Sequence, residues 1–167
     1  AQESRGLGDV YKRQLLESAG AVVVSVAYPL TPFPQPVDTG YGVLKWVHKH
    51  RTKLGGQGAA VYLAGEEAGG NLAAAVALMA RDQSHPPLAG QILLSPMLDP
   101  CVGTASLREA TGDSTGCKWT EGWRNFLRCP RDAEHPYAVP AGAQRLAGLP
   151  PTPVSYTHLT LPTIYSV

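Results

Sequence analysis

The feature that most constrains the fold is an apolar run that meets a tight glycine turn and continues directly as a helical pattern. The run covers residues 59–64, the turn is at Gly65, and residues 69–81 have apolar side chains at helical spacing. A short aliphatic run bounded by turn residues is typical of a buried strand, and a 3.6-residue period is typical of a helix. The segment therefore predicts a strand, a sharp turn and a helix, which together form a building unit of a parallel sheet.

The turn resembles the nucleophile elbow, a G-x-S-x-G motif that presents a catalytic side chain between a strand and a helix. Here Glu67 stands at the serine position of the frame Gly65-Glu66-Glu67-Ala68-Gly69. Glycines two residues to either side would relieve collisions at so sharp a turn, and the Ala68 N–H would point at a developing oxyanion. Glu66 and Gly70 would support the elbow. The alternative is an ordinary turn whose glycines serve close packing.

Two more apolar runs, at residues 21–27 and 91–95, have the composition of buried parallel strands. Residues 37–47 follow helical spacing, after a proline suited to a first helical turn. Alternating strands and helices predict an α/β fold of three layers with a mostly parallel sheet. Residues 141–147 are expected to form one more short helix. Residues 149–153 are expected to be a linker toward a strand that is missing.

From about Leu15 to Thr152 the chain resembles the α/β-hydrolase superfamily, and within it the hormone-sensitive-lipase-like esterases. The resemblance is carried by seven segments in the family's order: residues 20–32, 33–38, 44–47, 65–71, 91–99, 135–140 and 149–151. It implies an incomplete α/β-hydrolase fold from a lineage that hydrolyses carboxylic esters. The implied ligand is a small-molecule acyl ester, and we expect no cofactor and no metal.

The chain departs from the family pattern at the positions that carry the chemistry. Glu67 replaces the nucleophile and Pro29 replaces an arginine, while the family's oxyanion loop and its triad acid and histidine have no match here. Acyl transfer needs an activated nucleophile, a base within hydrogen-bond reach and oxyanion donors. Of these parts, only the Ala68 N–H is expected to be in place, so we expect the chain to be catalytically inactive as it stands.

Two other functions remain open. In a non-catalytic binding or regulatory pseudoenzyme, Glu67 would be a polar group at the mouth of a pocket. In an active hydrolase of another type, Glu67 itself would be a carboxylate nucleophile. Its attack on an ester would give an acyl anhydride, which is a poor intermediate, so this chemistry suits alkyl halides or epoxides better.

Both ends of the chain are expected to be non-native. Residues 1–14 and 154–167 contain stretches that resemble translated sequencing adapters in the correct relative orientation. Such segments are left out of fold reasoning. The remaining residues 15–153 are expected to form a partial α/β-hydrolase domain with a cap-like insertion at about 99–127.

Within the expected insertion, an apolar stripe follows helical spacing at Trp119, Trp123, Phe126 and Leu127. One interpretation is a stripe that faces the core. The other, implied by the family resemblance, is a cap helix over an acyl pocket.

Composition argues against several classes of partner. The formal net charge is +1 and no basic run interleaves with aromatic residues, which disfavours nucleic acid and acidic membranes. No stretch approaches the ~20 apolar residues of a membrane span. A cytoplasmic location is expected, and no protein partner is defined. Cys101, Cys117 and Cys129 lack metal-site spacing, and His48 and His50 are expected at a solvated helix end.

In the family's strand order a further strand lies between those resembling residues 21–27 and 59–64, and nothing in this chain corresponds to it. Two strands would then have unpaired edges in the middle of the sheet. Unpaired backbone groups cost about 1–3 kcal/mol each when buried, and open apolar edges favour aggregation. We therefore expect residues 15–153 alone to be poorly soluble or partly unfolded.

Overall fold

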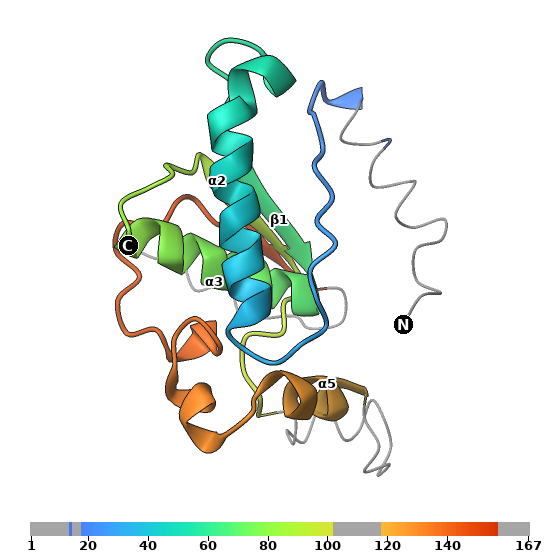
Figure 1. Cartoon of the computed structure of the whole chain (residues 1–167), viewed down its shortest axis with the longest axis vertical. Coiled ribbons are helices and arrows are strands. Elements are labelled where there is room, and N and C mark those ends of the chain that lie inside the picture. The colour runs from blue at the N-terminus through green and yellow to red at the C-terminus, as the bar shows by residue number, and fades with distance from the viewer. Residues whose placement is uncertain (1–13, 15–17, 102–117, 157–167) are drawn as a thin grey trace.

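The computed structural model describes residue 14 and residues 18–101 and 118–156 (Figure 1). In chain order its elements are α2 (Gln35–Gly55), β1 (Tyr62–Glu66), α3 (Ala68–Asp82), β2 (Gly90–Leu94), α5 (Lys118–Phe126), the 3-10 helices η1 (Pro130–Glu134) and η2 (Pro140–Gly142), and β3 (Val154–Ser155).

The three strands form one parallel sheet in the order β1-β2-β3. Tyr62 lies opposite Gly90, and the pairing continues in register to Glu66. Helix α3 connects β1 to β2, as parallel neighbours require a crossover connection. β3 adds a short pairing on the other side of β2. The predicted α/β class with a mostly parallel sheet is confirmed for the part of the chain that the structure describes.

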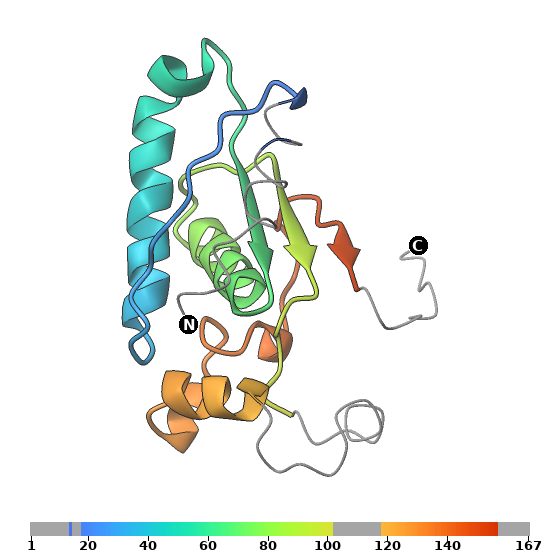
Figure 2. The ribbon, with the colours of Figure 1, turned by 90° about the vertical axis from the view of Figure 1, so that its right-hand side faces the viewer.

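Helix α3 is buried on nearly all sides because it lies between the sheet and α2 (Figure 2). Ten of its 15 residues are buried. On the sheet side, Ala73 and Ala74 form a cluster with Leu93 of β2. On the other side, Val76 belongs to the same core cluster as Val37 of α2. A helix in a middle layer must be apolar all round, and its alanines let both neighbours approach closely.

Helix α2 is the outer layer and confirms the helix predicted over residues 37–47. Pro36 lies in its first turn, where a missing N–H breaks no intrahelical hydrogen bond. Val37 and Leu44 are buried toward α3. A β-carbon added at Gly40 would lie 3.0 Å from Val76 Cγ2, so the two helices are in close contact at this glycine.

The apolar run at residues 21–27 is not a strand, contrary to the prediction. It passes β1 as an extended chain (Figure 2), and Val22, Val24 and Val26 are 58%, 38% and 38% exposed. A strand needs a neighbour to pair its backbone groups. Within the described residues, however, β1 pairs only with β2. The expected open edge of β1 is therefore present in the described part of the chain.

Two expectations about the C-terminal part of the domain are wrong. Residues 143–147 are not helical, and only the short η2 forms before them. Residues 149–153 do form a linker, but the strand after them, expected to be missing, is present as β3. The carbonyl oxygens of Pro151 and Pro153 in this linker each accept a hydrogen bond of 3.0 Å from the backbone of β2. Proline loses its N–H but keeps its acceptor, so it can pair at a sheet edge. The chain then enters β3, which lies in a segment expected to be non-native.

Helix α5 is the described end of the predicted insertion, of which residues 102–117 lie outside the described residues. It lies beyond the carboxyl ends of the strands (Figure 2). Trp123 is only 6% exposed and belongs to the main core cluster, against which Phe126 and Leu127 also pack. The apolar stripe therefore faces the domain, at the end of the sheet where α/β proteins bind ligands.

Candidate functional site

The site begins at the turn between β1 and α3. Glu67 has φ 48° and ψ −117°, a combination that side-chain-bearing residues rarely adopt. Its N–H donates to the Leu94 carbonyl at 3.1 Å. Its own carbonyl accepts from Asn71 N–H at 3.2 Å and from Met97 N–H at 3.0 Å. The strained backbone of Glu67 persists because this residue is hydrogen-bonded to strand β2, to helix α3 and to the loop after β2.

The glycines around the turn are needed for different reasons. A β-carbon at Gly65 would lie 2.1 Å from the Gly69 carbonyl oxygen, so no side chain fits there. One at Gly70 would lie 2.8 Å from the β-carbon of Pro96. Around Gly69 there is open space, with no atom within 4 Å, so the predicted collision at Gly69 is wrong. Close packing of the first turn of α3, onto β1 and onto the chain after β2, accounts for Gly65 and Gly70.

The other predicted site residues flank this turn. Ala68 is the first residue of α3, so its N–H has no acceptor within the helix and points out of the positive end of the helix. Glu66 ends β1 and is exposed. Its side chain does not line the pocket beside Glu67.

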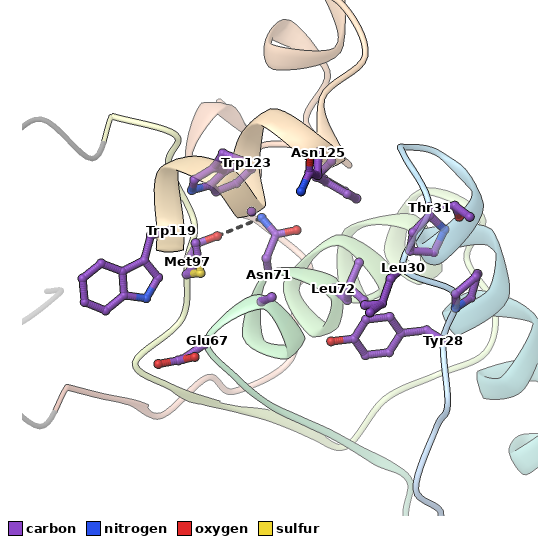
Figure 3. Close-up of a pocket in the computed structure, with 15 residues that line it drawn as sticks. Tyr28, Leu30, Thr31, Glu67, Asn71, Leu72, Met97, Trp119, Trp123 and Asn125 are labelled. Carbon is purple, nitrogen blue, oxygen red and sulfur yellow. Dashed lines mark hydrogen bonds between the residues drawn. The ribbon is translucent and has the colours of Figure 1, made fainter. Parts of the chain in front are cut away.

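A pocket of about 360 Å³ opens beside Glu67. Figure 3 shows Glu67 and Trp119 at one end and Tyr28 with Leu30 at the other. Helix α5 forms one wall and the first turns of α3 form the facing wall. Most of the lining is apolar or aromatic, and its larger side chains are those of Tyr28, Leu30, Leu72, Met97, Trp119, Trp123 and Phe126.

Asn71 joins the walls of this pocket. Its side-chain amide donates to the Met97 carbonyl at 2.9 Å and to the Ala138 carbonyl at 3.2 Å, and the residue is 4% exposed. Because both acceptors lie on other segments, Asn71 ties α3 to the loop after β2 and to the chain before η2. The prediction did not single out Asn71 or Tyr28, although both lie in segments quoted for the family resemblance.

The charge of the pocket is set by few groups. Among the described residues that line it, only Glu67 and Tyr28 can ionise. Burial raises the pKa of the Tyr28 hydroxyl above its ordinary value, so Tyr28 stays a neutral hydrogen-bonding group at pH 7. None of these lining residues is a histidine, lysine or arginine. The described pocket therefore has an acidic mouth and no basic side chain.

Two absences concern the described residues alone. The described residues contain no group of three or more histidine, cysteine, aspartate or glutamate side chains that could bind a metal ion. Their helices also include none with the length and apolar character needed to cross a membrane.

The prediction of a solvated helix end at His48 is wrong. The His48 ring stacks edge-on against His85 at 5.0 Å between centroids, and the Arg51 guanidinium donates to His48 Nε2 at 3.1 Å. Since arginine only donates, Nε2 must accept, which requires a neutral ring with its proton on Nδ1. His48 thus packs α2 against the chain that follows α3.

Comparison with known proteins places these features in a family. Residues 3–159 match the family described as alpha/beta hydrolase fold. Carboxylesterase NlhH of Mycobacterium tuberculosis is 42% identical over 81 residues, which cover 47% of this chain and 25% of that protein. Gibberellin receptor GID1C of Arabidopsis thaliana is 36% identical over 153 residues, which cover 84% of this chain and 43% of the receptor.

Among solved structures, the hyperthermophilic esterase from Pyrobaculum calidifontis superposes with a TM-score of 0.77 at 38% sequence identity. The match covers 87% of this chain and 50% of the esterase chain. This chain therefore spans about half or less of the length of the relatives that it matches.

Proposed function

This chain belongs to the family with the α/β-hydrolase fold, and on that premise we propose that it carries the acyl-ester-binding part of an esterase-type domain and does not itself hydrolyse esters. One observation carries the proposal. The strained turn that would present a nucleophile presents Glu67 at the mouth of an apolar pocket. The lining supplies apolar surface for an acyl group, which is what small-ligand pockets commonly offer.

The groups in the described lining of the pocket support the proposed lack of catalysis. A serine-type mechanism needs a hydroxyl and a histidine within hydrogen-bond reach of it. At the nucleophile position stands a carboxylate, and none of the described lining residues is a histidine. The Ala68 N–H at the helix end remains suited to a carbonyl oxygen, which supports binding of an ester without its cleavage.

A second candidate function is that of a small-molecule receptor. The relative named as a gibberellin receptor is 36% identical to this chain, a value close to the 38% of the Pyrobaculum esterase. In a receptor, Glu67 would contact the ligand and no turnover would be required. The receptor function and the ester-binding function would use the same pocket, but the ligand of a receptor need not be an ester.

The test uses p-nitrophenyl butyrate with the full chain and its Glu67→Gln and Glu67→Ser variants. Binding is followed by the fluorescence of Trp119 and Trp123, and cleavage by release of p-nitrophenolate. We expect saturable binding by all three proteins and cleavage no faster than in buffer.

Three results separate the functions. Cleavage by the unaltered chain that disappears in Glu67→Gln would overturn the proposal in favour of a carboxylate nucleophile. Cleavage gained only by Glu67→Ser would contradict the expectation that a catalytic base is missing, and would leave the absent hydroxyl as the reason why the unaltered chain is inactive. Absence of binding by all three proteins would overturn the proposed ester pocket.

A further inference from the structure

We propose that helix α2 binds an anionic lipid surface through a basic face on its solvent-exposed side. The basic face consists of Lys45, Trp46, Lys49 and Lys53, all of which are exposed. Helix α2 is the outer layer of the fold and packs its buried side against α3 (Figure 2). No residue of the basic face lines the pocket beside Glu67, so this proposal does not depend on the proposed function.

The three lysines form one row along the helix. They are spaced by four residues, so their side chains follow one another on the same side of α2. From Lys45 to Lys53 the helix rises by about 12 Å. Trp46 lies one turn before Lys49, and its side chain is 50% exposed. The basic face therefore combines a row of ammonium groups with an aromatic ring that is open to solvent.

The positive charge of this face has no acidic residue near it in the chain. Residues 39–65 carry Lys45, Lys49, Arg51 and Lys53 but no aspartate or glutamate. The Arg51 guanidinium donates to the ring and to the carbonyl of His48, so Arg51 is engaged within the helix. The three lysines remain to attract a partner of opposite charge.

Elsewhere in the described chain, basic residues stand beside acidic ones. Arg81 and Arg145 both pair with Asp82, and residues 121–134 hold three arginines together with three acidic residues. The net charge of +1, which disfavoured acidic membranes, is a sum over the whole chain. Within the described residues, the fold concentrates the unbalanced positive charge on one side of α2.

A lipid surface fits these side chains better than a nucleic acid does. Lysine carries a point charge on a flexible stem, which suits mobile headgroups, whereas the bidentate recognition of a phosphate in a fixed position favours arginine. Tryptophan is enriched at the level of the headgroups, and each lysine near an anionic leaflet adds to the attraction. We therefore expect α2 to lie along the surface with the Trp46 ring among the headgroups.

The experiment measures co-sedimentation of the full chain with two kinds of vesicle. One kind is phosphatidylcholine alone, and the other contains phosphatidylcholine and phosphatidylserine in a ratio of two to one. At low salt the chain should bind the anionic vesicles at least about tenfold more strongly, because several lysines contribute. Physiological salt should weaken this binding. Tryptophan emission should shift to shorter wavelength on binding, and Trp46→Phe should bind without that shift.

Two double variants of equal net charge test the location. Lys49→Gln with Lys53→Gln removes two charges from the basic face and should weaken binding to the anionic vesicles about tenfold. Arg124→Gln with Arg131→Gln is the matched control, because it removes two charges from exposed positions outside α2. The control should bind nearly as well as the unaltered chain. Circular dichroism checks that each variant is folded, and sedimentation without vesicles is subtracted.

Four results would overturn the proposal. Equal binding to both kinds of vesicle would exclude recognition of anionic lipid. Equal losses in the two double variants would show that net charge, and not the basic face, controls binding. An emission shift that survives in Trp46→Phe would place the contact on another part of the chain. Stronger binding to double-stranded DNA than to the anionic vesicles, at the same phosphate concentration and salt, would favour a nucleic-acid partner instead.

Discussion

At the scale of single residues, the turn concentrates its constraints on Glu67 and Gly65. Glu67 has a strained backbone that three hydrogen bonds to separate segments hold in place. Gly65 packs against the backbone of α3 with no room for a β-carbon. Strain of this kind costs of order 1–3 kcal/mol and persists only where the surroundings enforce it. At position 67, glycine is therefore expected to give a more stable protein than alanine. At position 65, replacing glycine by alanine is expected to lower the stability.

Glu67→Gly should be more stable than Glu67→Ala by about 1 kcal/mol, because glycine alone removes the strain at positive φ. The alanine variant is the matched control, since it also loses the carboxylate but keeps the β-carbon. Urea denaturation at low protein concentration measures the difference. Elsewhere in folded proteins glycine is usually the less stable of the two, so the reverse order would show that residue 67 is not strained.

Gly65→Ala should lower the free energy of unfolding by about 3 kcal/mol or prevent folding, because its β-carbon would overlap the Gly69 carbonyl. Gly69→Ala is the control, four residues further along the same motif and in the first turn of α3. Space around Gly69 is open, and alanine favours a helix by up to ~1 kcal/mol, so this variant should be as stable as the unaltered chain or more so. Equal losses in both variants would contradict the packing described for the turn.

At the scale of elements, helix α3 is held at both ends by other parts of the chain. Asn71 in its first turn binds carbonyls of two other segments. In its last turn, Asp82 accepts a hydrogen bond from the Tyr137 hydroxyl at 2.8 Å. Burial and this bond raise the pKa of Tyr137 to about 12. Helix α2 also contacts the chain after α3, where His48 packs against His85 and the Tyr41 hydroxyl donates to the His85 carbonyl at 2.6 Å.

The contact of His48 predicts a pH-dependent stability. Burial, the Arg51 guanidinium and His85 lower the pKa of His48 below its ordinary value of 6.5. The unfolded chain thus binds a proton more readily than the folded one, and the free energy of unfolding falls as the pH drops below about 6.5 toward the folded pKa. Above that pH the contribution is fully present, because the ring is neutral in both states.

His48→Gln should flatten this slope between pH 7.5 and pH 5 in urea denaturation. His50→Gln is the control for the loss of a histidine from the same helix, since His50 stacks on Trp46 and does not contact His85. We expect the His50 variant to keep the slope. A slope that is the same in all three proteins would rule out His48 as its source.

At the scale of the whole molecule, one edge of the sheet is open within the described residues. β1 pairs on one side only, Tyr62 is 60% exposed, and Val22 is 58% exposed on the neighbouring extended segment. Unpaired strand edges beside apolar side chains promote pairing between molecules. The family's further strand, which has no counterpart in this chain, was expected at this same edge.

The isolated chain should therefore associate as its concentration rises and unfold over a broad temperature range. Val22→Thr keeps the shape of the side chain but replaces a methyl group with a hydroxyl, and should reduce association measured by light scattering. Leu146→Thr is the control, since Leu146 is 63% exposed but does not lie beside β1. A sharp, cooperative melt of a strictly monomeric chain would contradict the prediction.

The non-native origin of residues 1–14 and 154–167 stays a prediction. The family match covers residues 3–159, so it includes most of the first segment and the start of the second. Strand β3, which begins at Val154, also lies in the second segment. An uninterrupted natural reading frame through both segments and the domain between them would contradict it.

Elements whose signal is local could be predicted from the amino-acid sequence. The apolar run, the glycine turn and the helical period predicted β1, the turn at Glu67 and α3. The steric exclusion at Gly65 acts between residues four apart, and the helical period can be seen in consecutive residues. The α/β class followed from the same alternation. The position of Glu67 at a nucleophile-like turn also needed no tertiary information.

Only the tertiary structure decided what depends on partners distant in the chain. Residues 21–27 have the composition of a strand but lie unpaired, because pairing is a property of a neighbour and not of the run itself. Pro151 and Pro153 pair with β2 through their carbonyls. The pocket likewise exists only because α5, α3 and residues 28–31 converge beside Glu67, and no local pattern records how separate segments meet in space.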